Sequence, residues 1–170
     1  MSGNRGVRRA VAAVGAAIVV GAMSPTVATA RPVTAKPTSW PALNAAIARI
    51  PTYHAGAATW VVSSAYDYWG TADWYHDVLY VAPTVPGNRL YDVAAHEWSH
   101  ELSVLDYGGN VAKAKRAMNA YFGGSHLVGA ERAADCMAIL QGATWTHYTT
   151  CRSLHWRAGA RRLVHGHKLP

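Results

Sequence analysis

The most chemically distinctive residues of this 170-residue chain form the pentad His96-Glu97-Trp98-Ser99-His100, an H-E-x-x-H pattern. Four residues make slightly more than one helical turn, so a helix would project both imidazoles from one face, close enough to bind a single metal ion. Glu97 stands beside them and could reach a water molecule at that ion as a general base. The pattern is short and occurs often by chance, but here it lies in a predicted helix that follows a predicted strand, which favours a metal site. We therefore predict a metal site at this pentad.

A catalytic zinc ion needs a third protein ligand and an open position for water. Downstream of the pentad, Glu131 and Asp135 stand four residues apart, which places both carboxylates on one face of a second predicted helix. Glu131 could complete the metal site. Asp135 could accept the ring N–H of a ligating histidine and so fix its tautomer. We expect Glu131 to be the third ligand.

Two other residues could take the place of Glu131. Asp106 follows His100 by six residues, which is where metzincin-type sites place their third ligand. Those sites also require a glycine three residues after the second histidine, so that the helix can break and turn back, and here that position is Ser103. His126 is the remaining alternative. The choice of Glu131 therefore has to be tested against Asp106 in particular.

Together, His96-Glu97-x-x-His100 and Glu131-x-x-Ala134-Asp135 resemble the gluzincin metallopeptidases, especially small exported bacterial zinc peptidases whose second motif reads E-x-x-A-D. The resemblance covers about residues 78–151. It implies that His96, His100 and Glu131 hold one Zn²⁺ and that Glu97 is the base. It also implies that Asp135 does not bind the ion itself and instead contacts one of its ligands. It also implies an edge strand across the cleft, for which we expect residues 78–82. A peptide or protein substrate could pair with that strand by backbone hydrogen bonds.

The reaction implied by the resemblance is hydrolysis of a peptide bond. Zinc lowers the pKa of water and polarises the scissile carbonyl, while Glu97 takes the proton and passes it to the leaving amine. The developing oxyanion needs a further donor, for which His147, Tyr148 and His155 are candidates, with an ordinary surface or core position as the alternative for each. The alternative, from a different class, is an exported cell-surface or binding protein with a structural or vestigial zinc site.

The first thirty residues have the features of a secretory signal peptide. Three arginines precede an apolar run over residues 11–23 that is too short to span a bilayer, and Ala28-Thr29-Ala30 supplies the small residues that a signal peptidase needs. We expect cleavage after Ala30 and a secreted protein, with an uncleaved membrane anchor as the alternative. The mature chain would have 140 residues, with 13 Lys and Arg against 9 Asp and Glu.

The remaining net charge of +4 is concentrated at the C-terminal end. No acidic residue follows Asp135, whereas five basic residues do: Arg152, Arg157, Arg161, Arg162 and Lys168. This segment could make weak contact with an anionic cell surface. We expect no nucleic-acid partner, because the chain has no recognition motif for one. A monomer is the expected state.

The two cysteines, Cys136 and Cys151, fall in the mature part of the chain. Secreted proteins mature in compartments that allow disulfides, so we expect these residues to form one. Structural zinc sites use closely spaced cysteine pairs, and two isolated cysteines do not fit that pattern. A bridge would tie the loop over residues 144–150 back to the helix that bears Glu131.

The composition, 51% hydrophobic and 15% charged, is typical of a globular domain. The residue pattern predicts an extended lead-in and a short helix over residues 31–52, followed by a zinc-peptidase-like domain over 53–170. Strands are expected at 60–62 and 78–81, and helices at 42–50, 88–105, 111–122, 127–141 and 152–164. We predict an α+β fold, a minimal zincin-like domain whose small N-terminal sheet packs on the active-site helix. Five aromatic residues are expected to be buried in this small core, with a surface that grips substrate as the alternative: Tyr66, Tyr68, Trp69, Trp74 and Tyr75.

Overall fold

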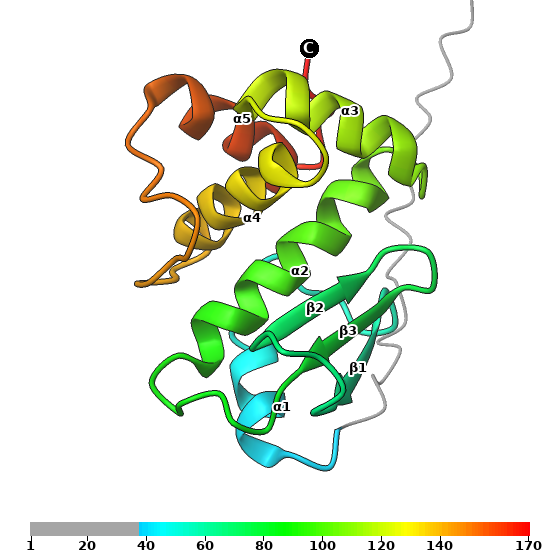
Figure 1. Ribbon diagram of the computed structural model, residues 1–170, viewed down its shortest axis with the longest axis vertical. Coiled ribbons are helices and arrows are strands. Elements are labelled where there is room, and N and C mark those ends of the chain that lie inside the picture. The colour runs from blue at the N-terminus through cyan, green and yellow to red at the C-terminus, as the bar shows by residue number, and fades with distance from the viewer. Residues whose placement is uncertain (1–37) are drawn as a thin grey trace, which may run out of the picture. The chain divides into compact units, whose positions relative to one another are not determined.

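The computed structural model describes residues 38–170, which form an α+β fold of five helices and one three-stranded sheet (Figure 1). The predicted signal peptide and most of the lead-in lie outside the described residues. In chain order the elements are α1 (Pro41–Ile47), β1 (Thr59–Val62), β2 (Gly70–Asp73), β3 (Val78–Val81), α2 (Leu90–Asp106), α3 (Val111–Phe122), α4 (Val128–Leu140) and α5 (Leu154–Val164). Within this part of the chain, no helix is long and apolar enough to cross a membrane.

The sheet places β3 between β1 and β2. β1 runs parallel to β3, whereas β2 is antiparallel to it and pairs Gly70 with Val81. The prediction that residues 78–82 form the edge strand is therefore wrong. The edge strands are β1 and β2, and the one that lines the pocket is β2, which the sequence did not predict because Gly70, Ala72 and Asp73 are residue types that strands disfavour.

Helix α2 lies between the sheet and α4 (Figure 1). The two helices can approach closely because the residues between them are small and fully buried, as Ala95 and Ala133 are. On another side of α2, Trp98 is fully buried, and the edge of its ring meets Tyr53 at a centroid distance of 5.1 Å. The indole N–H of Trp98 donates to the hydroxyl of Thr52 at 2.8 Å. This packing fixes α2 and thereby the direction of its histidines.

The predicted helices are all present, with ends that differ from the prediction by a few residues. Two of their N-termini have polar caps. The Asn110 side chain accepts the backbone N–H of Lys113 at the start of α3 (2.9 Å), and Ser153 accepts that of Trp156 at the start of α5 (3.3 Å). These caps satisfy helix-terminal N–H groups that would otherwise have no partner.

Most of the aromatic cluster is exposed. Tyr66, Tyr68, Trp69 and Tyr75 keep 39% to 76% of their surface accessible, and only Trp74 is buried. The prediction that this cluster fills a small core is therefore wrong for four of its five members. The physical reason is that these four residues lie in the loops on either side of β2, outside the strand positions that face α2.

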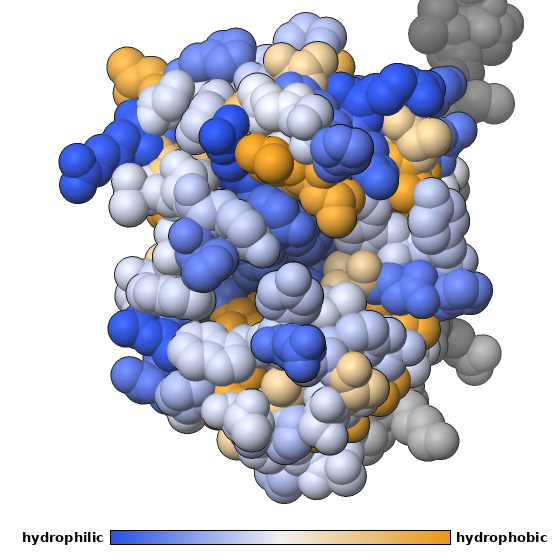
Figure 2. All heavy atoms as spheres, viewed as in Figure 1, coloured by the Kyte–Doolittle hydropathy of each residue, from blue (hydrophilic) through white to orange (hydrophobic). Residues whose placement is uncertain are grey.

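Charge is unevenly distributed over the surface. The space-filling view shows strongly hydrophilic side chains at the end of the molecule formed by α3 and α5, among some hydrophobic ones, and further hydrophilic side chains over the rest of this face (Figure 2). Exposed basic residues on these helices include Lys113, Arg116, Arg161 and Arg162, whereas the exposed acids Asp67 and Asp77 flank the sheet. Contact of this basic end with an anionic cell surface stays a prediction.

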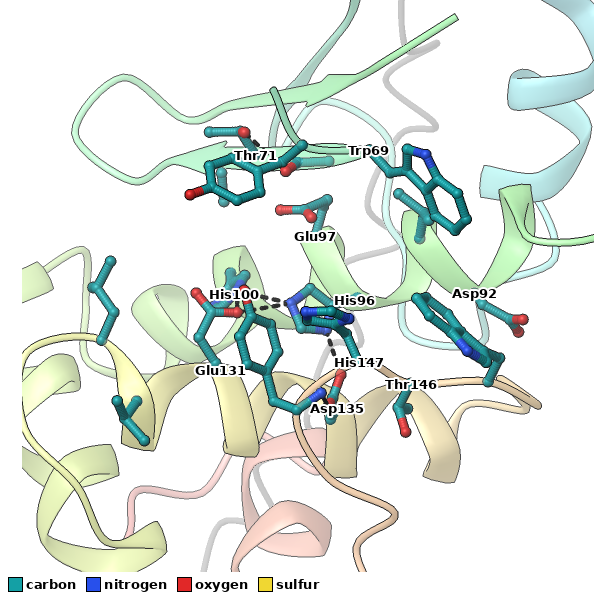
Figure 3. Close-up of a pocket in the computed structure, with 18 of the residues that line it drawn as sticks. Trp69, Thr71, Asp92, His96, Glu97, His100, Glu131, Asp135, Thr146 and His147 are labelled. Carbon is teal, nitrogen blue, oxygen red and sulfur yellow. Dashed lines mark hydrogen bonds and ion pairs between the residues drawn. The ribbon is translucent and has the colours of Figure 1, made fainter. Parts of the chain in front are cut away.

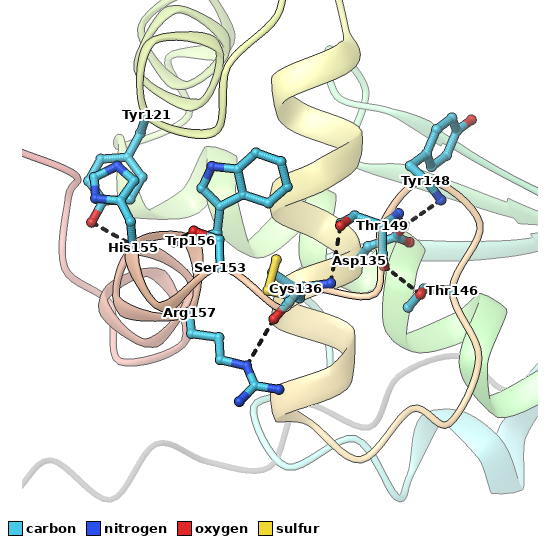
Figure 4. Close-up of a disulfide and its surroundings, with 11 residues drawn as sticks. Tyr121, Asp135, Cys136, Thr146, Tyr148, Thr149, Ser153, His155, Trp156 and Arg157 are labelled. Atoms are coloured by element: carbon cyan, nitrogen blue, oxygen red, sulfur yellow. Dashed lines mark hydrogen bonds between the residues drawn. A yellow bond between two sulfur atoms is a disulfide. The ribbon is translucent and has the colours of Figure 1, made fainter.

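The predicted disulfide between Cys136 and Cys151 is present and both residues are buried (Figure 4). It joins α4 to the end of the loop over residues 143–150. Cys151 has a left-handed backbone conformation with φ of 49°, which is unusual for a residue with a side chain. The Arg157 side chain donates to the carbonyl oxygen of Cys151 at 2.9 Å and helps to hold this conformation.

Replacing both cysteines by alanine is expected to lower the free energy of unfolding by about 3 kcal/mol, the value for a bridge that closes a loop of about 15 residues. Urea unfolding of the variant and of the oxidised wild type measures the difference. The wild type unfolded with dithiothreitol present is the matched control, because it has the same open loop with the native sequence. A variant as stable as the oxidised wild type would contradict this role of the bridge.

Candidate metal centre

Two helices bring three candidate ligands together. His96 and His100 project from one face of α2, and Glu131 faces them from α4 (Figure 3). The Nε2 atoms of the two histidines are 3.2 Å apart, and Glu131 Oε2 lies 3.1 Å from the first and 3.2 Å from the second. Among residues 38–170, these three form the group that could hold a metal ion.

The hydrogen bonds at His96 favour a cation between these atoms. The Nδ1 atom of His96 lies 2.8 Å from Oδ1 of Asp135, and because a carboxylate only accepts, Nδ1 is the donor. The Nε2 atom of a neutral His96 therefore presents a lone pair, and so does Oε2 of Glu131. Two lone pairs at 3.1 Å need a positive charge between them, which a proton or a metal ion can supply.

The acid–base properties of the group agree with this reading. Burial disfavours the charged form of His96, but its hydrogen bonds to Asp135 and Glu131 outweigh burial and raise its pKa to about 10. Burial would raise the pKa of Glu131, but His100 and His96 hold it well below its usual range. In the absence of a metal ion the group therefore attracts a proton strongly, which is the electrostatic condition for binding another cation.

The spacing fits a small four-coordinate ion. Nitrogen and oxygen ligands about 2.0–2.2 Å from such an ion stand roughly 3.3–3.6 Å apart in tetrahedral geometry. The three distances in this site are 3.1 and 3.2 Å, so little movement is needed. The ring of Trp74 packs on His100 at a centroid distance of 5.2 Å and limits how far that ligand can turn. The Nδ1 atom of His100 is buried and has no hydrogen-bond partner within residues 38–170.

Glu97 lies beside the candidate ligands without joining them. Its side chain is buried and points toward β2 in the same pocket (Figure 3). Burial raises its pKa, and the neighbouring His96 and His100 oppose that rise. Gly70 makes this placement feasible, because a Cβ atom at position 70 would overlap the Glu97 carboxylate. A buried carboxylate next to a metal site can accept a proton from water there.

Asp135 connects the metal group to a loop. Its Oδ1 atom accepts the N–H of His96, while Oδ2 accepts the backbone N–H groups of Tyr148 (2.6 Å) and Thr149 (2.7 Å). The side chain is fully buried, so these three hydrogen bonds satisfy it in place of water. The structure therefore places Asp135 where the sequence predicts it, and adds a contact that the sequence did not suggest.

A pocket of about 670 Å³ surrounds the group, with the sheet on one side and α4 on the other (Figure 3). Of the three candidate oxyanion donors, His147 and Tyr148 line this pocket. His155 lies elsewhere, stacked on Tyr121 at a centroid distance of 4.0 Å. Burial and the carboxylates of the site raise the pKa of Tyr148 to about 12, so its hydroxyl keeps its proton and can donate. The lining residues that the sequence did not single out include Gly70, Leu127, Val128 and Trp145.

The two alternative third ligands lie apart from this group. Helix α2 continues through Ser103 without a break, which carries Asp106 about 9 Å beyond His100 along the axis. His126 is exposed just before α4, in a left-handed conformation with φ of 54°. Neither belongs to the group that could hold a metal ion, whereas Glu131 does.

Asp106 has a different effect, on stability. Its Oδ2 atom is buried without a partner among the described residues, and burial raises its pKa to about 7. The folded protein therefore keeps this proton to a higher pH than the unfolded chain, so the contribution of Asp106 to stability falls between about pH 4 and pH 7. We expect Asp106→Asn to melt at a higher temperature than the wild type at pH 8, with a smaller difference at pH 5. An equal difference in melting temperature at pH 5 and pH 8 would contradict burial of the Asp106 carboxyl and its raised pKa.

Comparison with known proteins gives no match to this chain among protein-family models, curated proteins or solved structures. Two imidazoles and a carboxylate that can share one cation, with a separate buried carboxylate at hand in a pocket, form a constellation suited to metal-assisted reactions of water.

Proposed function

We propose that this protein is a secreted zinc-dependent peptidase, in which His96, His100 and Glu131 hold one Zn²⁺ and Glu97 activates water for attack on a peptide bond. The observation that supports this most is the convergence of the three ligand atoms within 3.2 Å, while Glu97 lies beside them in the same pocket and stays outside their hydrogen bonds. A hydrolytic zinc site needs this division between ligands and base.

The ligand set favours zinc over other common ions. Calcium and magnesium prefer oxygen ligands, whereas two imidazoles and one carboxylate are a usual catalytic zinc set with a position left for water. When bound, zinc supplies a Lewis acid for the scissile carbonyl and makes a nearby water molecule easier to deprotonate. Asp135 orients His96 for this task through the hydrogen bond to its Nδ1 atom.

The other residues of the pocket fit a peptide substrate. β2 pairs with β3 along one edge, and its residues Gly70, Thr71 and Ala72 line the pocket. A peptide that adds to the outer edge of β2 by backbone hydrogen bonds would bring its carbonyl groups past Glu97 and His96. His147 and Tyr148, across the pocket, offer polar groups for the oxyanion that forms when water attacks.

The test uses the mature chain, residues 31–170, loaded with zinc. We expect one zinc ion per chain, cleavage of casein or of a quenched peptide library, loss of cleavage with a chelator such as 1,10-phenanthroline, and recovery on adding zinc. Zinc binding without hydrolysis of any peptide would overturn the proposed activity and favour a binding protein with a structural zinc site. Mass spectrometry of the exported protein tests cleavage after Ala30.

A further inference from the structure

We propose that Trp69 and Trp145 form a subsite that binds an aromatic side chain of the peptide substrate. The inference rests on the proposed function, since it names the kind of peptide that the same pocket accepts. Trp69 precedes β2, and Trp145 lies in the loop after α4 that the disulfide closes. Their ring centroids are 5.6 Å apart with the planes inclined by 49°.

The two rings line the pocket from opposite walls. Trp69 belongs to the wall formed by the sheet and Trp145 to the wall formed by the loop, so their contact joins the walls at one end of the pocket. Trp69 is 39% exposed even though it has this contact, and Trp145 is partly exposed. A face of the pair is therefore available for a further flat ring, which aromatic pairs accept in tilted or offset arrangements.

Several contacts hold Trp145 in place before a substrate arrives. The guanidinium of Arg89 lies 5.4 Å from the centroid of its ring, and the ring of His147 lies at 6.1 Å. The preceding residue is fixed as well, because the backbone N–H of Thr144 donates to the buried carboxylate of Asp92 at 2.8 Å. A ring that is already ordered loses little freedom when a ligand binds to it.

The position of the pair relative to the reacting groups points to a substrate side chain. Figure 3 shows Trp69 on the sheet side of the pocket, at the end where Asp92 and Thr146 also lie and on the far side of His96 from Glu131. Trp69 directly precedes the edge strand, so a peptide extended along β2 passes it close to the scissile bond. Alternate side chains of such a peptide point to opposite sides of the strand, so one of them can face the two indoles.

The other end of the pocket has different chemistry. Leu127 and Val128 line it one turn before Glu131 on α4, and both are 43% exposed. These aliphatic side chains offer no aromatic face. We therefore expect the preference for aromatic residues at a single position of the substrate, on one side of the cleaved bond.

The test profiles cleavage of a diverse peptide mixture by mass spectrometry. For the zinc-loaded protein we expect Phe, Tyr or Trp enriched at one fixed position relative to the cleaved bond. For the best peptide of this kind, Trp145→Ala should lower kcat/KM about tenfold, while a matched peptide with alanine at that position changes less than about twofold. Trp145→Phe, which keeps a flat ring, should restore most of the preference.

Tyr75→Ala is the matched control, because Tyr75 is an aromatic residue that is 76% exposed and does not line the pocket. It should leave the cleavage profile unchanged. Melting temperatures of all variants show whether a loss of preference reflects unfolding. Cleavage without an aromatic preference, or a preference that survives both Trp69→Ala and Trp145→Ala, would overturn the subsite and leave the proposed peptidase activity standing.

A binding measurement separates this inference from the proposed function. In Glu97→Gln protein loaded with zinc, calorimetry should give about tenfold tighter binding for an uncleaved peptide with Phe at the selected position than for its alanine analogue. Trp145→Ala in the same background should remove the difference. If the wild type cleaves no peptide, the same binding measurement is made with a set of peptides that carry Phe at each position in turn. Tighter binding of one of them, lost in Trp145→Ala, would still support the subsite. Equal binding of the two analogues would overturn it.

Discussion

Glu97→Gln is expected to lower kcat/KM for peptide hydrolysis by about a hundredfold or more, the usual contribution of a general base. Glutamine has nearly the same shape as glutamate but cannot accept the proton of the attacking water. Because Glu97 makes no hydrogen bond to His96, His100 or Glu131, zinc stoichiometry and affinity should stay close to those of the wild type. Quenched-peptide kinetics and a chelator competition measure the two quantities on the same preparation.

The control for this variant is Asp77→Asn. It removes one carboxylate outside the pocket, and asparagine tolerates the φ of 52° found at position 77. Its activity should match that of the wild type within about twofold. If Glu97→Gln kept full activity with zinc bound, Glu97 would not be the base and hydrolysis would need another proton acceptor.

The second large effect is expected at Glu131. Glu131→Ala leaves only His96 and His100 on α2 as ligands, so tight binding of one zinc ion should be lost, by about a hundredfold or more in affinity. Zinc should then no longer raise the melting temperature of the variant, whereas it raises that of the wild type by binding only the folded chain. Calorimetric titration with zinc gives the affinities directly.

Asp106→Ala provides the comparison that decides between the two candidate ligands. Asp106 lies about 9 Å further along α2, outside the group of three donors, so its removal should leave zinc affinity unchanged. Loss of zinc binding in Asp106→Ala with binding kept in Glu131→Ala would assign the third ligand to Asp106 and place the site with the metzincins.

The central part of the site could be predicted from the sequence because helical spacing alone places it. His96 and His100 share a face through their separation of four residues, and Glu131 and Asp135 do so for the same reason. That the two faces meet depends on packing, which the small buried alanines of both helices allow. The fold class followed from the same patterns of strands and helices.

The sheet was predicted less well, because the order of strands is a long-range property. Residues 78–81 were recognised as a strand, but their central position depends on β2, whose residue types gave no signal. Position 70 lies where β2 approaches the Glu97 carboxylate and has room only for glycine. Glycine is a residue type that strands disfavour, so this close contact removes the local signal for a strand. The place of Trp145 in the pocket could not be predicted for a related reason, since Trp145 lies in a loop without periodicity and its contacts with Trp69 and Arg89 join residues far apart in the sequence.

The three hydrogen bonds of Asp135 couple two parts of the chain that are distant in sequence, the histidine ligand on α2 and the loop after α4. One oxygen accepts the ring N–H of the candidate ligand His96 (Figure 3), and the other accepts the backbone N–H groups of Tyr148 and Thr149 (Figure 4). A cation that fixes His96 therefore stabilises this loop conformation. A ligand that stabilises the same loop conformation in turn raises the affinity for the cation, by the same factor as the cation raises the affinity for that ligand. If the proposed peptidase activity holds, substrate that contacts Tyr148 or the nearby Trp145 would strengthen retention of the metal ion, and the protein would lose its ion most readily when no substrate is bound.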